Sequence, residues 1–495
     1  MIRKFDLIVI GGGTGLDIAN AAAARGYRVA IVEKGMLGGT CLNSGCIPSK
    51  LLIHSADIVQ MIKNAETFGI RVSDISIDFQ KIVKRVNKIT DDESNKITEE
   101  LSKLDNPVLF TEQCYFIDNK KLAFKRTSDK EEKKEEEEGE EEQAEANDTS
   151  QSFNDDTLTA DKIVIATGTV PKIPEIQGLA YSGFITSDEA LRLRKQPRVI
   201  TFIGGGYIAC ELAHFFGSLG TKVNIIQRND YLIPNEDKEI SEKFTDIFRS
   251  KYQIYLGYNT ESVSKVQVNN NNDEKIFRIL TKNKTNGKKI EVDSDQLVVS
   301  TGREANSSIL NLEKTGVHVD KDGFIVVDKN LETTTPGIFA LGDIIGKYQF
   351  KHSATLEAQY AYHNIFANKS QEKIPVDYTA MPHAIFSSPQ VAGVGFTEQQ
   401  LKEQKNIRYL KSIYHYIDTG MGLAIDDKEG FVKFLIDKKN RKILGCHILG
   451  TYASTLIHEV LVSMRSGDGT IDSISNTIHI HPALSEVVGR AASNI

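Results

Sequence analysis

Apolar positions along this chain gather in short runs that end at glycine and are followed by alanine-rich stretches of helical length. A run at 5–10 leads into Gly11-Gly12-Gly13-Thr14-Gly15, and a stretch at 18–25 continues through Gly26 to a second apolar run at 28–32. Runs of this kind are typical of buried parallel strands, and the stretch between them suits an amphipathic helix. The pattern predicts a β-α-β unit at the start of the chain.

The same arrangement recurs near residue 200. An apolar run at 198–203 leads into Gly204-Gly205-Gly206, a helical stretch follows to Leu219, and a further apolar run covers 222–226. A lone glycine motif is weak support for nucleotide binding, but two in the same setting predict two nucleotide sites.

Towards the C-terminus the period of the pattern changes. Apolar and polar residues alternate at 431–436 and 442–449, with helical patterns near 398–403 and 452–465. Alternation of this sort favours an antiparallel sheet with one face covered. We therefore expect an α/β protein with two Rossmann-like dinucleotide-binding domains and a C-terminal α+β domain.

The first glycine cluster stands where the pyrophosphate of a dinucleotide would approach the backbone at a helix N-terminus. Gly11, Gly13 and Gly15 can form this turn, and Glu33 follows about 20 residues later, where a carboxylate accepts hydrogen bonds from ribose. A G-x-G-x-x-G motif that begins at Gly11 would end at position 16, which is Leu16. We therefore expect slightly altered packing between this helix and its strand.

In the second unit, Gly204 and Gly206 supply the turn, but the following strand ends in Gln227-Arg228. The change removes the carboxylate that would accept from a ribose hydroxyl, and it offers a cation where a 2′-phosphate would lie. NADPH is therefore favoured over NADH. The alternative is that Arg228 is an ordinary surface arginine.

Two cysteines, Cys41 and Cys46, follow the first unit directly. If residues 41–46 open a helix, the two sulfurs lie about one turn apart, and the positive end of the helix dipole favours a thiolate. Such a pair suits disulfide exchange. Buried structural cysteines or half of a zinc site are the alternatives, although the other cysteines are scattered singly and offer no second ligand pair: Cys114, Cys210 and Cys446. We expect no metal site.

Composition limits the class of protein. The chain of 495 residues is 40% apolar, enough for two to four ordinary cores. No apolar run reaches the roughly 20 residues of a membrane helix, and the first residues pass directly into a strand, leaving no room for a targeting peptide. We expect a cytoplasmic protein with neither membrane nor nucleic-acid partners, in which any disulfide is catalytic.

The formal charge of −7 comes from one segment, since residues 129–145 hold 11 acidic and 3 basic side chains. The composition of 127–156 predicts a solvated, disordered acidic insert, and a partner-binding tract is the alternative. A second polar tract, from Asn269 to Asn272 and on to Asn286-Gly287, is expected to be an enlarged hairpin loop.

With these elements in this order, the chain resembles the flavin-dependent pyridine nucleotide-disulfide oxidoreductases over nearly its whole length. The resemblance is carried by GGTCLNSGCIPSK at 38–50, GGGYIACE at 204–211, ALGD at 340–343 and HIHPALSE at 479–486. It implies one FAD per subunit, a nicotinamide co-substrate, a small disulfide or dithiol substrate, and a homodimer.

The resemblance also implies a domain order. The FAD-binding domain would cover 1–170 and resume at 300–373, the NAD(P)-binding domain would cover 171–299, and an interface domain would cover 374–495. Apolar strands that end in Thr-Gly, at 161–168 and 297–302, would close the crossings between domains.

Roles follow by resemblance for six residues. Cys41 resembles the interchange thiol that attacks the substrate, and Cys46 the thiol beside the flavin. Lys50 resembles a lysine near the flavin, with Glu211 as its carboxylate partner. His481 resembles the acid-base histidine supplied by the partner subunit, oriented by Glu486, and His479 is its competitor.

Further positions are expected to contact the cofactors. Tyr207 stands where some members place an aromatic gate over the flavin. The other residues expected to bind FAD or the nicotinamide nucleotide are Lys34, Gly39, Thr40, Ala166, Thr167, Gly168, Ile208, Gly302, Gly342 and Asp343.

The branch within the family is less uniform. Cys46-Ile47-Pro48-Ser49-Lys50 resembles dihydrolipoyl dehydrogenase, whereas the segments at 351–358 and 481–484 resemble the mycothione and glutathione reductase branch. No cysteine follows Cys446, which argues against the mercuric and large thioredoxin reductases. We expect a dihydrolipoyl dehydrogenase-like enzyme, with an NADPH-dependent reductase of small disulfides as one alternative and a flavin-binding redox sensor or scaffold as the other.

Overall fold

The computed structural model describes residues 1–125, 156–267, 275–367, 372–404 and 406–495. Apart from Asp156, the acidic insert expected at 127–156 lies outside these residues, and so does the Asn-rich tract at 269–272. The expectation of one enlarged hairpin loop that continues to Asn286-Gly287 is wrong, because residues 275–283 form a strand paired on both sides. None of the described helices is long and apolar enough to cross a bilayer.

The chain forms two compact units, each built from three segments. The first comprises Met1–Cys46, Ile89–Val170 and Arg303–Val376, and the second comprises Ile47–Lys88, Pro171–Gly302 and Asp377–Ile495. Two of these breaks differ by three residues from the expected 299 and 373. Residues 47–88, which were expected within the FAD-binding domain, group with the second unit.

The first unit is organised around a mixed sheet of seven strands in the order β3-β2-β1-β6-β5-β4, with β16 paired to β6. β1, β2, β3, β6 and β16 run parallel to one another, whereas β5 pairs antiparallel with β6 and β4 pairs antiparallel with β5. The strands are β1 (Ile2–Ile10), β2 (Val29–Val32), β3 (Val108–Phe110), β4 (Cys114–Asp118), β5 (Lys121–Phe124), β6 (Thr157–Ile165) and β16 (Ile338–Ala340).

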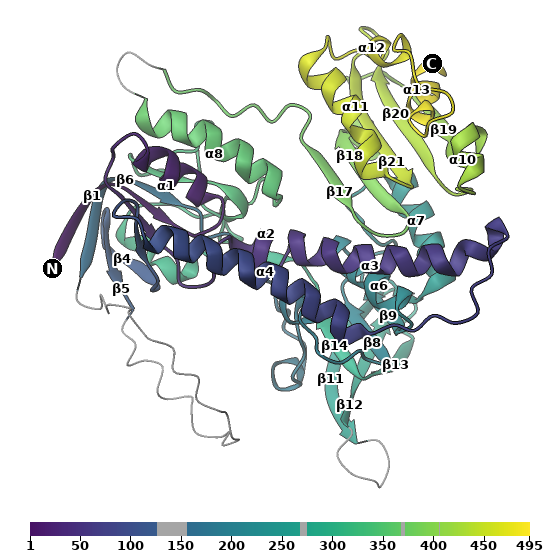
Figure 1. Ribbon diagram of the computed structural model, residues 1–495, viewed down its shortest axis with the longest axis horizontal. Helices are drawn as coiled ribbons and strands as arrows, with labels where there is room; N and C mark the ends of the chain where they lie inside the picture. Colours follow the sequence, from purple (N-terminus) through teal and green to yellow (C-terminus); the bar gives the residue numbers. More distant parts are fainter. Residues whose placement is uncertain (126–155, 268–274, 368–371, 405) are drawn as a thin grey trace. The chain divides into compact units, whose positions relative to one another are not determined.

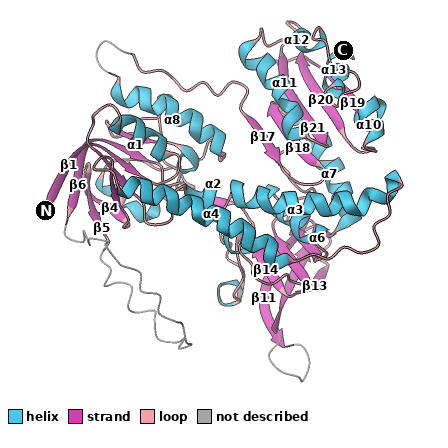
Figure 2. Cartoon of the chain, viewed as in Figure 1, coloured by secondary structure: helices cyan, strands magenta, loops and turns pink. Residues whose placement is uncertain are grey.

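Both faces of this sheet are buried. Ile8 and Ile10 of β1 pack into one apolar cluster, and Leu7 and Val9 pack into another on the opposite face, as the period of two requires. Two helices, α1 (Gly15–Ala23) and α8 (Lys351–Phe366), lie side by side over one face (Figure 2). The continuous apolar runs of the sequence thus correspond to parallel strands covered on both sides.

The second unit holds two further sheets and a three-stranded meander. The parallel sheet has the order β10-β9-β8-β14, and the C-terminal sheet is antiparallel with the order β17-β18-β21-β20-β19. The strands are β8 (Val199–Ile203), β9 (Lys222–Gln227), β10 (Gln253–Leu256), β11 (Tyr258–Gln267), β12 (Lys275–Asn283), β13 (Lys289–Ser294), β14 (Gln296–Val299), β17 (Pro382–Ile385), β18 (Gln390–Gly395), β19 (Tyr409–His415), β20 (Phe431–Asp437) and β21 (Ile443–Gly450). A short pair, β7 (Thr169–Pro171) and β15 (Arg303–Ala305), lies where the chain passes between the units.

Helices cover these sheets, and α11 crosses β18 and β21 (Figure 1). The helices of this unit are α5 (Ser187–Ala190), α6 (Tyr207–Ser218), α7 (Lys238–Lys251), α9 (Glu398–Glu403), α10 (Gly420–Ala424), α11 (Ala453–Ser466), α12 (Asp472–Ser475) and α13 (Glu486–Ser493). Three more helices lie at or across the breaks between units: α2 (Gly39–Asn43), α3 (Cys46–Asn64) and α4 (Phe79–Ser102). The expected fold class, two β-α-β units and a C-terminal α+β domain, is confirmed.

Candidate active site

The first glycine loop requires glycine for steric reasons. Gly11 has φ +115° and donates its N–H to the carbonyl of Val32 at 2.9 Å. A Cβ at this position would lie 2.3 Å from the carbonyl oxygen of Ala166 at the end of β6. The loop therefore lies directly against the Ala166-Thr167-Gly168 segment, and the structure brings together two segments that were singled out separately in the sequence.

Glu33 holds this loop from the end of β2. Its carboxylate accepts the N–H of Gly12 at 2.6 Å and the N–H of Gly35 at 2.8 Å. A carboxylate has about four acceptor positions, so two bonds leave it able to accept from a ribose hydroxyl as well. The neighbouring Lys34 is exposed.

The departure at position 16 has a structural explanation. A Cβ at Gly15 would lie 2.6 Å from Cγ1 of Val9, so the close approach of α1 to β1 occurs there. Leu16 is only 8% exposed and packs into the same apolar cluster as Val9. A leucine is thus accommodated because the preceding glycine supplies the contact.

The segment that carries the two cysteines, residues 38–50, begins next to the same loop. Gly38 donates its N–H to the carbonyl of Gly12 at 2.8 Å, and a Cβ at Gly39 would lie 2.8 Å from Cα of Gly13. The side-chain amide of Asn43 donates to the carbonyls of Met36, Leu37 and Gly39 at 3.0–3.2 Å. Asn43 therefore fixes the turn before the thiols, a role that its residue type alone does not indicate. Thr40 lies exposed on α2.

The two cysteines lie on two separate helices, so the condition that residues 41–46 open one helix is not met. Cys41 is half-buried within α2, Cys46 is the exposed first residue of α3, and Ser44-Gly45 separates them. The break is sterically fixed, because a Cβ at Gly45 would lie 2.8 Å from the carbonyl of Thr40. Cys46 still begins a 19-residue helix, the position at which the helix dipole favours a thiolate.

The other three cysteines have a different environment. Burial raises the pKa of Cys114 to about 12 and raises those of Cys210 and Cys446 well above the ordinary value. These thiols are held protonated in apolar surroundings and are inert as nucleophiles. Among the residues that the structure describes, no group of His, Cys, Asp and Glu could hold a metal ion, so geometry gives no support to the zinc alternative.

A polar cluster follows the first Thr-Gly strand end. The hydroxyl of Thr167 is buried and has no hydrogen-bond partner in the described part of the chain. Asp343 accepts from the hydroxyl of Thr169 at 3.1 Å, and burial raises its pKa although Arg303 opposes the shift. Gly342 donates its N–H to the buried carboxylate of Glu357 at 2.6 Å. Thr167 and Asp343 thus offer polar atoms that the chain itself does not satisfy fully.

The second glycine loop repeats the geometry of the first. Gly204 has φ +107°, donates to the carbonyl of Ile226 at 2.9 Å, and would place a Cβ 2.3 Å from the carbonyl of Ser300. A Cβ at Gly205 would lie 3.1 Å from Cβ of Gln227, and one at Gly12 would lie 3.1 Å from Cβ of Glu33. The two β-α-β units therefore have the same loop geometry, but the loop packs against Glu33 in the first and against Gln227 in the second.

Other expected residues surround the second loop. No heavy atom lies within 4 Å of the Cβ position at Gly206, and the same holds at Gly302. Tyr207, the first residue of α6, is 39% exposed, and Ile208 is half-buried. The amide of Gln227 is buried and donates to the carbonyl of Tyr231 at 3.4 Å, whereas Arg228 is exposed.

Lys50 and Glu211 meet within the second unit. Nζ of Lys50 lies 3.0 Å from Oε1 and 2.8 Å from Oε2 of Glu211, and 4.6 Å from the ring centroid of Phe386. The backbone N–H of Phe386 donates to the same carboxylate at 2.9 Å. The Glu211 side chain is 8% exposed and that of Lys50 is 35% exposed, so the ammonium is held in place and still reaches the surface of its unit.

His481 and Glu486 form a second charged pair in this unit. Nδ1 of His481 lies 3.1 Å from both carboxylate oxygens of Glu486, and the hydrogen bond lowers the pKa of that carboxyl. The imidazole of His481 is 73% exposed. His479, the competitor, is 14% exposed and bonds Glu459 at 2.7 Å. The side chain of His481 is therefore open to solvent in the chain, whereas that of His479 is mostly buried and bonded to Glu459.

Comparisons with known proteins agree over the whole chain. Residues 5–358 match the family model described as pyridine nucleotide-disulphide oxidoreductase, and residues 381–492 match the dimerisation domain of that family. Mycothione reductase of Mycobacterium tuberculosis strain H37Rv is 31% identical, with 99% of each chain covered. A dihydrolipoyl dehydrogenase of Bacillus subtilis strain 168 is 32% identical, with 99% of this chain and 98% of the relative covered.

A solved structure gives the same result. The HOCl-induced flavoprotein disulfide reductase RclA of Escherichia coli, in its Cu(II) complex, is 26% identical and covers 99% of both chains with a TM-score of 0.81. The match includes both nucleotide-binding units and the C-terminal sheet. The chain therefore belongs to the pyridine nucleotide-disulphide oxidoreductase family and is an FAD-dependent enzyme that also uses a nicotinamide nucleotide.

Proposed function

We propose that this enzyme is a homodimer that uses NADPH to reduce a small disulfide through Cys41 and Cys46, with an architecture like that of dihydrolipoyl dehydrogenase. The observation that carries the nucleotide and the direction is the end of β9, where Gln227-Arg228 stands in place of a carboxylate. Family members linked to NADP usually reduce disulfides, whereas members linked to NAD usually oxidise dithiols.

The residues of the first unit fit FAD. The tight loop at Gly11 and Gly13 allows a pyrophosphate to approach the backbone at the start of α1, and Glu33 can accept from a ribose. The unsatisfied hydroxyl of Thr167 and the buried carboxylate of Asp343 offer partners for further polar groups of the cofactor. When bound, FAD supplies the two-electron carrier between nicotinamide and sulfur.

Thiol chemistry then falls to the two cysteines. We assign Cys41 as the nucleophile that attacks one sulfur of the substrate disulfide and releases the other as a thiolate. Cys46 next attacks the Cys41 sulfur of the mixed disulfide, which releases the second substrate thiol and leaves a Cys41–Cys46 disulfide. Two electrons from NADPH reopen this disulfide for the next turnover.

Lys50 lies on α3, one helical turn after Cys46, and Glu211 of α6 holds its ammonium in place. Both oxygens of Glu211 contact the ammonium of Lys50 and so hold this side chain in place. A positioned cation stabilises negative charge that develops beside it. We assign the pair to tuning the electronics of the bound flavin.

Proton transfer is assigned to His481. A departing thiolate needs a proton, and an imidazole that titrates near neutrality can supply it and take it back. Glu486 bonds Nδ1, which directs Nε2 outward as the exchanging atom. The segment also carries Ile478 and Ile480, 96% and 78% exposed, and such side chains support burial against a second subunit.

The test compares both nucleotides on several substrates. Purified enzyme would be assayed with lipoamide, oxidised glutathione and mycothiol disulfide, each with NADPH and NADH. We expect higher kcat/KM with NADPH, and Arg228→Leu should raise the KM for NADPH about tenfold, roughly the loss of one charge-assisted hydrogen bond.

Arg249→Leu is the matched control, because it removes another exposed arginine from the same unit. It should leave both KM values unchanged. Equal efficiency with NADH, or equal loss in both arginine variants, would contradict the assignment of NADPH. Fast NAD-linked oxidation of dihydrolipoamide would instead favour the dehydrogenase direction, in keeping with the relative from Bacillus subtilis.

A further inference from the structure

A series of hydrogen-bonded polar side chains connects α3 to α6, in addition to the pair formed by Lys50 and Glu211. Oδ1 of Asp57 lies 2.7 Å from Nε2 of His214, and Nδ1 of His214 lies 3.2 Å from the hydroxyl of Ser218. That hydroxyl also accepts from the amide of Gln60 at 3.1 Å, and Lys63 donates to the Ser218 carbonyl at 2.8 Å. We call these five residues the polar seam.

The hydrogen bonds of the polar seam follow one direction. The Gln60 amide N–H donates to the Ser218 oxygen, and the hydroxyl hydrogen of Ser218 remains able to donate to Nδ1 of His214. Nε2 of His214 then carries the proton and donates to Asp57. Both ring nitrogens of His214 are thus used in hydrogen bonds.

Breaking this chain would be costly. The His214 side chain is 1% exposed and Ser218 is fully buried, although Asp57 remains 40% exposed. A buried polar group that loses its partner costs roughly 1–3 kcal/mol. The polar seam therefore strongly favours one pairing of the two helices.

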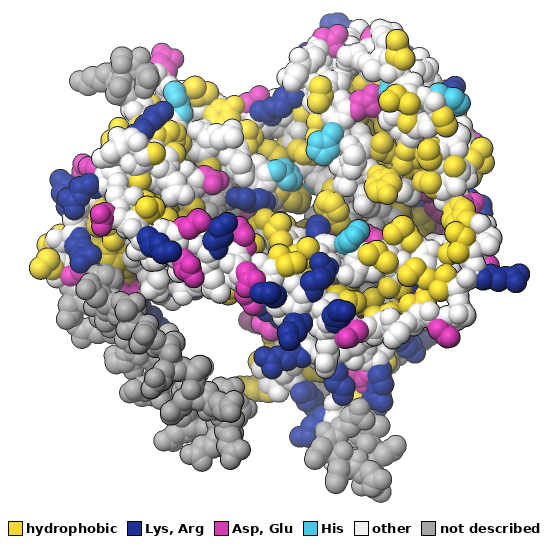
Figure 3. All heavy atoms as spheres, viewed as in Figure 1, with side chains coloured by type: hydrophobic (Ala, Val, Ile, Leu, Met, Phe, Trp, Pro, Cys, Tyr) yellow, Lys and Arg dark blue, Asp and Glu magenta, His cyan; other side chains and the backbone are white. Residues whose placement is uncertain are grey.

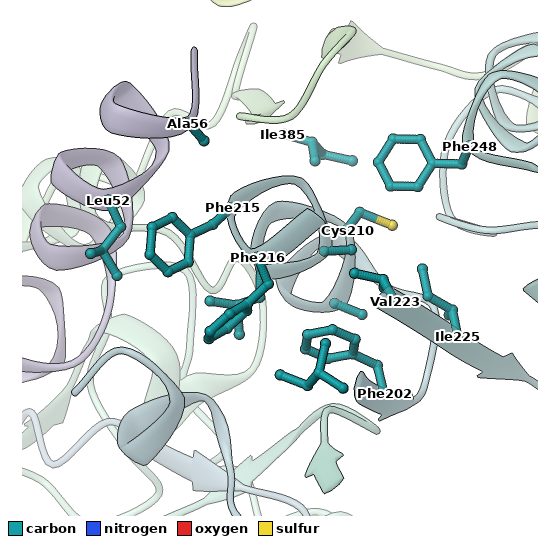
Figure 4. Close-up of a cluster of buried hydrophobic side chains, with 14 of the residues drawn as sticks. Leu52, Ala56, Phe202, Cys210, Phe215, Phe216, Val223, Ile225, Phe248 and Ile385 are labelled. Carbon is teal, nitrogen blue, oxygen red and sulfur yellow. The ribbon is translucent and has the colours of Figure 1, made fainter. Parts of the chain in front are cut away.

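Apolar contacts around the polar seam do not favour one position of α3 along α6 to the same extent. Leu52 and Ala56 of α3 belong to the cluster that contains Phe215 and Phe216 of α6, and Figure 4 shows Leu52 pointing towards Phe215. Apolar burial is nondirectional, so a small shift of one helix along the other changes it little. A buried network of hydrogen bonds fixes the register.

We propose that His214, through Asp57, is a positioning residue that sets the register of α3 on α6 and so keeps Lys50 against Glu211. Asp57 lies seven residues after Lys50, and His214 lies three after Glu211, spacings that place each pair on one helix face. The importance for catalysis rests on the role proposed above for Lys50 and Glu211. The positional coupling itself does not.

The experiment measures the position of Lys50 and not turnover. Full-length, FAD-loaded enzyme would be treated briefly with acetic anhydride, and acetylation of Lys50 would be quantified by peptide mass spectrometry relative to the exposed Lys238. Glu211→Gln provides the reference for a released lysine. His214→Leu removes both hydrogen bonds, and His214→Gln keeps an amide donor for Asp57 and an acceptor for Ser218.

We expect His214→Leu to raise the acetylation rate of Lys50 about tenfold, the equivalent of one lost hydrogen bond to a charged group. His214→Gln should stay within about twofold of the parent enzyme, because an amide restores both bonds. Thr245→Val is the control for a buried bond lost elsewhere in the unit, since its hydroxyl accepts from Leu232 and donates to Ser241. It should lower the melting temperature without changing the labelling of Lys50.

The opposite results would overturn the proposal. If His214→Leu lowers the melting temperature as Thr245→Val does and leaves Lys50 labelling unchanged, His214 only stabilises the fold. If His214→Leu does not fold, Asp57→Ala takes its place, because Asp57 is half-exposed and its loss is milder, and unchanged labelling there has the same meaning. Normal kinetics of Lys50→Met would contradict the proposed role of Lys50, but would leave the coupling intact.

Discussion

The ammonium of Lys50 lies 2.8 Å from Oε2 of Glu211, although 161 residues separate the two in the sequence. The same carboxylate accepts the backbone N–H of Phe386, and the lysine lies over the ring of that residue. Three segments of the second unit therefore meet at Glu211. Its loss should affect both the stability and the chemistry of the enzyme.

Glu211→Gln tests this pair directly. The amide keeps an acceptor for Phe386 but leaves Lys50 without a counter-charge, so we expect the free energy of unfolding in urea to fall by about 1.5–3 kcal/mol. Flavin reduction by NADPH in stopped-flow measurements should slow as well. Glu261→Gln is the control, because its pair with Lys289 has the same 2.8 Å distance and is more exposed, and exposed pairs contribute about 0–1 kcal/mol. Equal losses in the two variants would argue against a special role for Glu211.

Glycine substitutions should separate folding from nucleotide binding. Gly204→Ala forces a Cβ to within 2.3 Å of a carbonyl oxygen at positive φ, whereas Gly206→Ala meets no heavy atom within 4 Å. We expect the first variant to fold poorly. The second should melt within a few degrees of the parent but show a KM for NADPH raised about tenfold or more, because its methyl group would occupy the space left for the pyrophosphate. An unchanged KM in Gly206→Ala would show that the nucleotide does not approach this glycine.

The glycine loops and the thiols could be predicted because each is local in the sequence. Gly11, Glu33 and Cys46 lie in short motifs whose residue types indicate the chemistry that we propose for them. Asn43 was missed, since an asparagine that bonds three carbonyls differs in no visible way from one in any turn. Whether one helix holds both cysteines could not be decided from their spacing, because Gly45 lies against the carbonyl of Thr40 between two separate helices.

Long-range polar pairs could not be predicted from residues alone. His214 and Asp57 are 157 positions apart, and a buried histidine on an apolar helix face gives no sign of its partner. The grouping of residues 47–88 with the second unit has the same origin, because it depends on which apolar face packs against α3. His481 was preferred to His479 from the sequence because Pro482 follows it, as in the family that the chain resembles. The structure adds that the His481 side chain is the more exposed of the two.

A buried lysine should make the fold sensitive to acid. Lys433 is fully buried and bonds Asp237, Glu239 and Glu398 at 2.7–2.8 Å. Burial opposes ionisation of Glu398, but hydrogen bonds from Lys433 and Lys402 outweigh it and lower the pKa from 4.5 to about 2. A lowered pKa stabilises the fold above the unfolded value, so this contribution is complete above pH 4.5 and is lost as the pH falls towards 2.

Lys433→Met tests the network, because it leaves three carboxylates around an apolar side chain. We expect the free energy of unfolding at pH 7 to fall by about 3–5 kcal/mol. Glu398→Gln should flatten the loss of stability on acidification, as measured by urea unfolding between pH 5 and 3. An acid profile of Glu398→Gln that superimposes on that of the parent enzyme would show that this carboxyl is not linked to stability.

His481 should control the pH dependence of turnover. We expect His481→Gln to lower kcat about 10²–10⁴-fold, as loss of a general acid-base does, and to remove one limb of the pH profile. The hydrogen bond from His481 lowers the pKa of Glu486, so this carboxylate stays charged at a lower pH than an ordinary glutamate does. The hydrogen-bonded pair is therefore expected to remain at mildly acidic pH. His479→Gln is the control, and it should reduce stability through the loss of its bond to Glu459 while keeping the profile.

Mixed dimers decide whether His481 acts across the subunit interface. Two differently tagged chains, one with Cys46→Ser and one with His481→Gln, would be coexpressed and purified through both tags. If each site combines the thiols of one chain with the histidine of the other, one of the two sites in this dimer is intact. Activity should then return to about half that of the parent dimer, since a twofold symmetric assembly has two equivalent sites. If the thiols and the histidine act within one chain, both sites carry a substitution and the mixed dimer stays inactive. That result would contradict a site shared between subunits. It would also leave the exposed Ile478 and Ile480 without the role proposed for them.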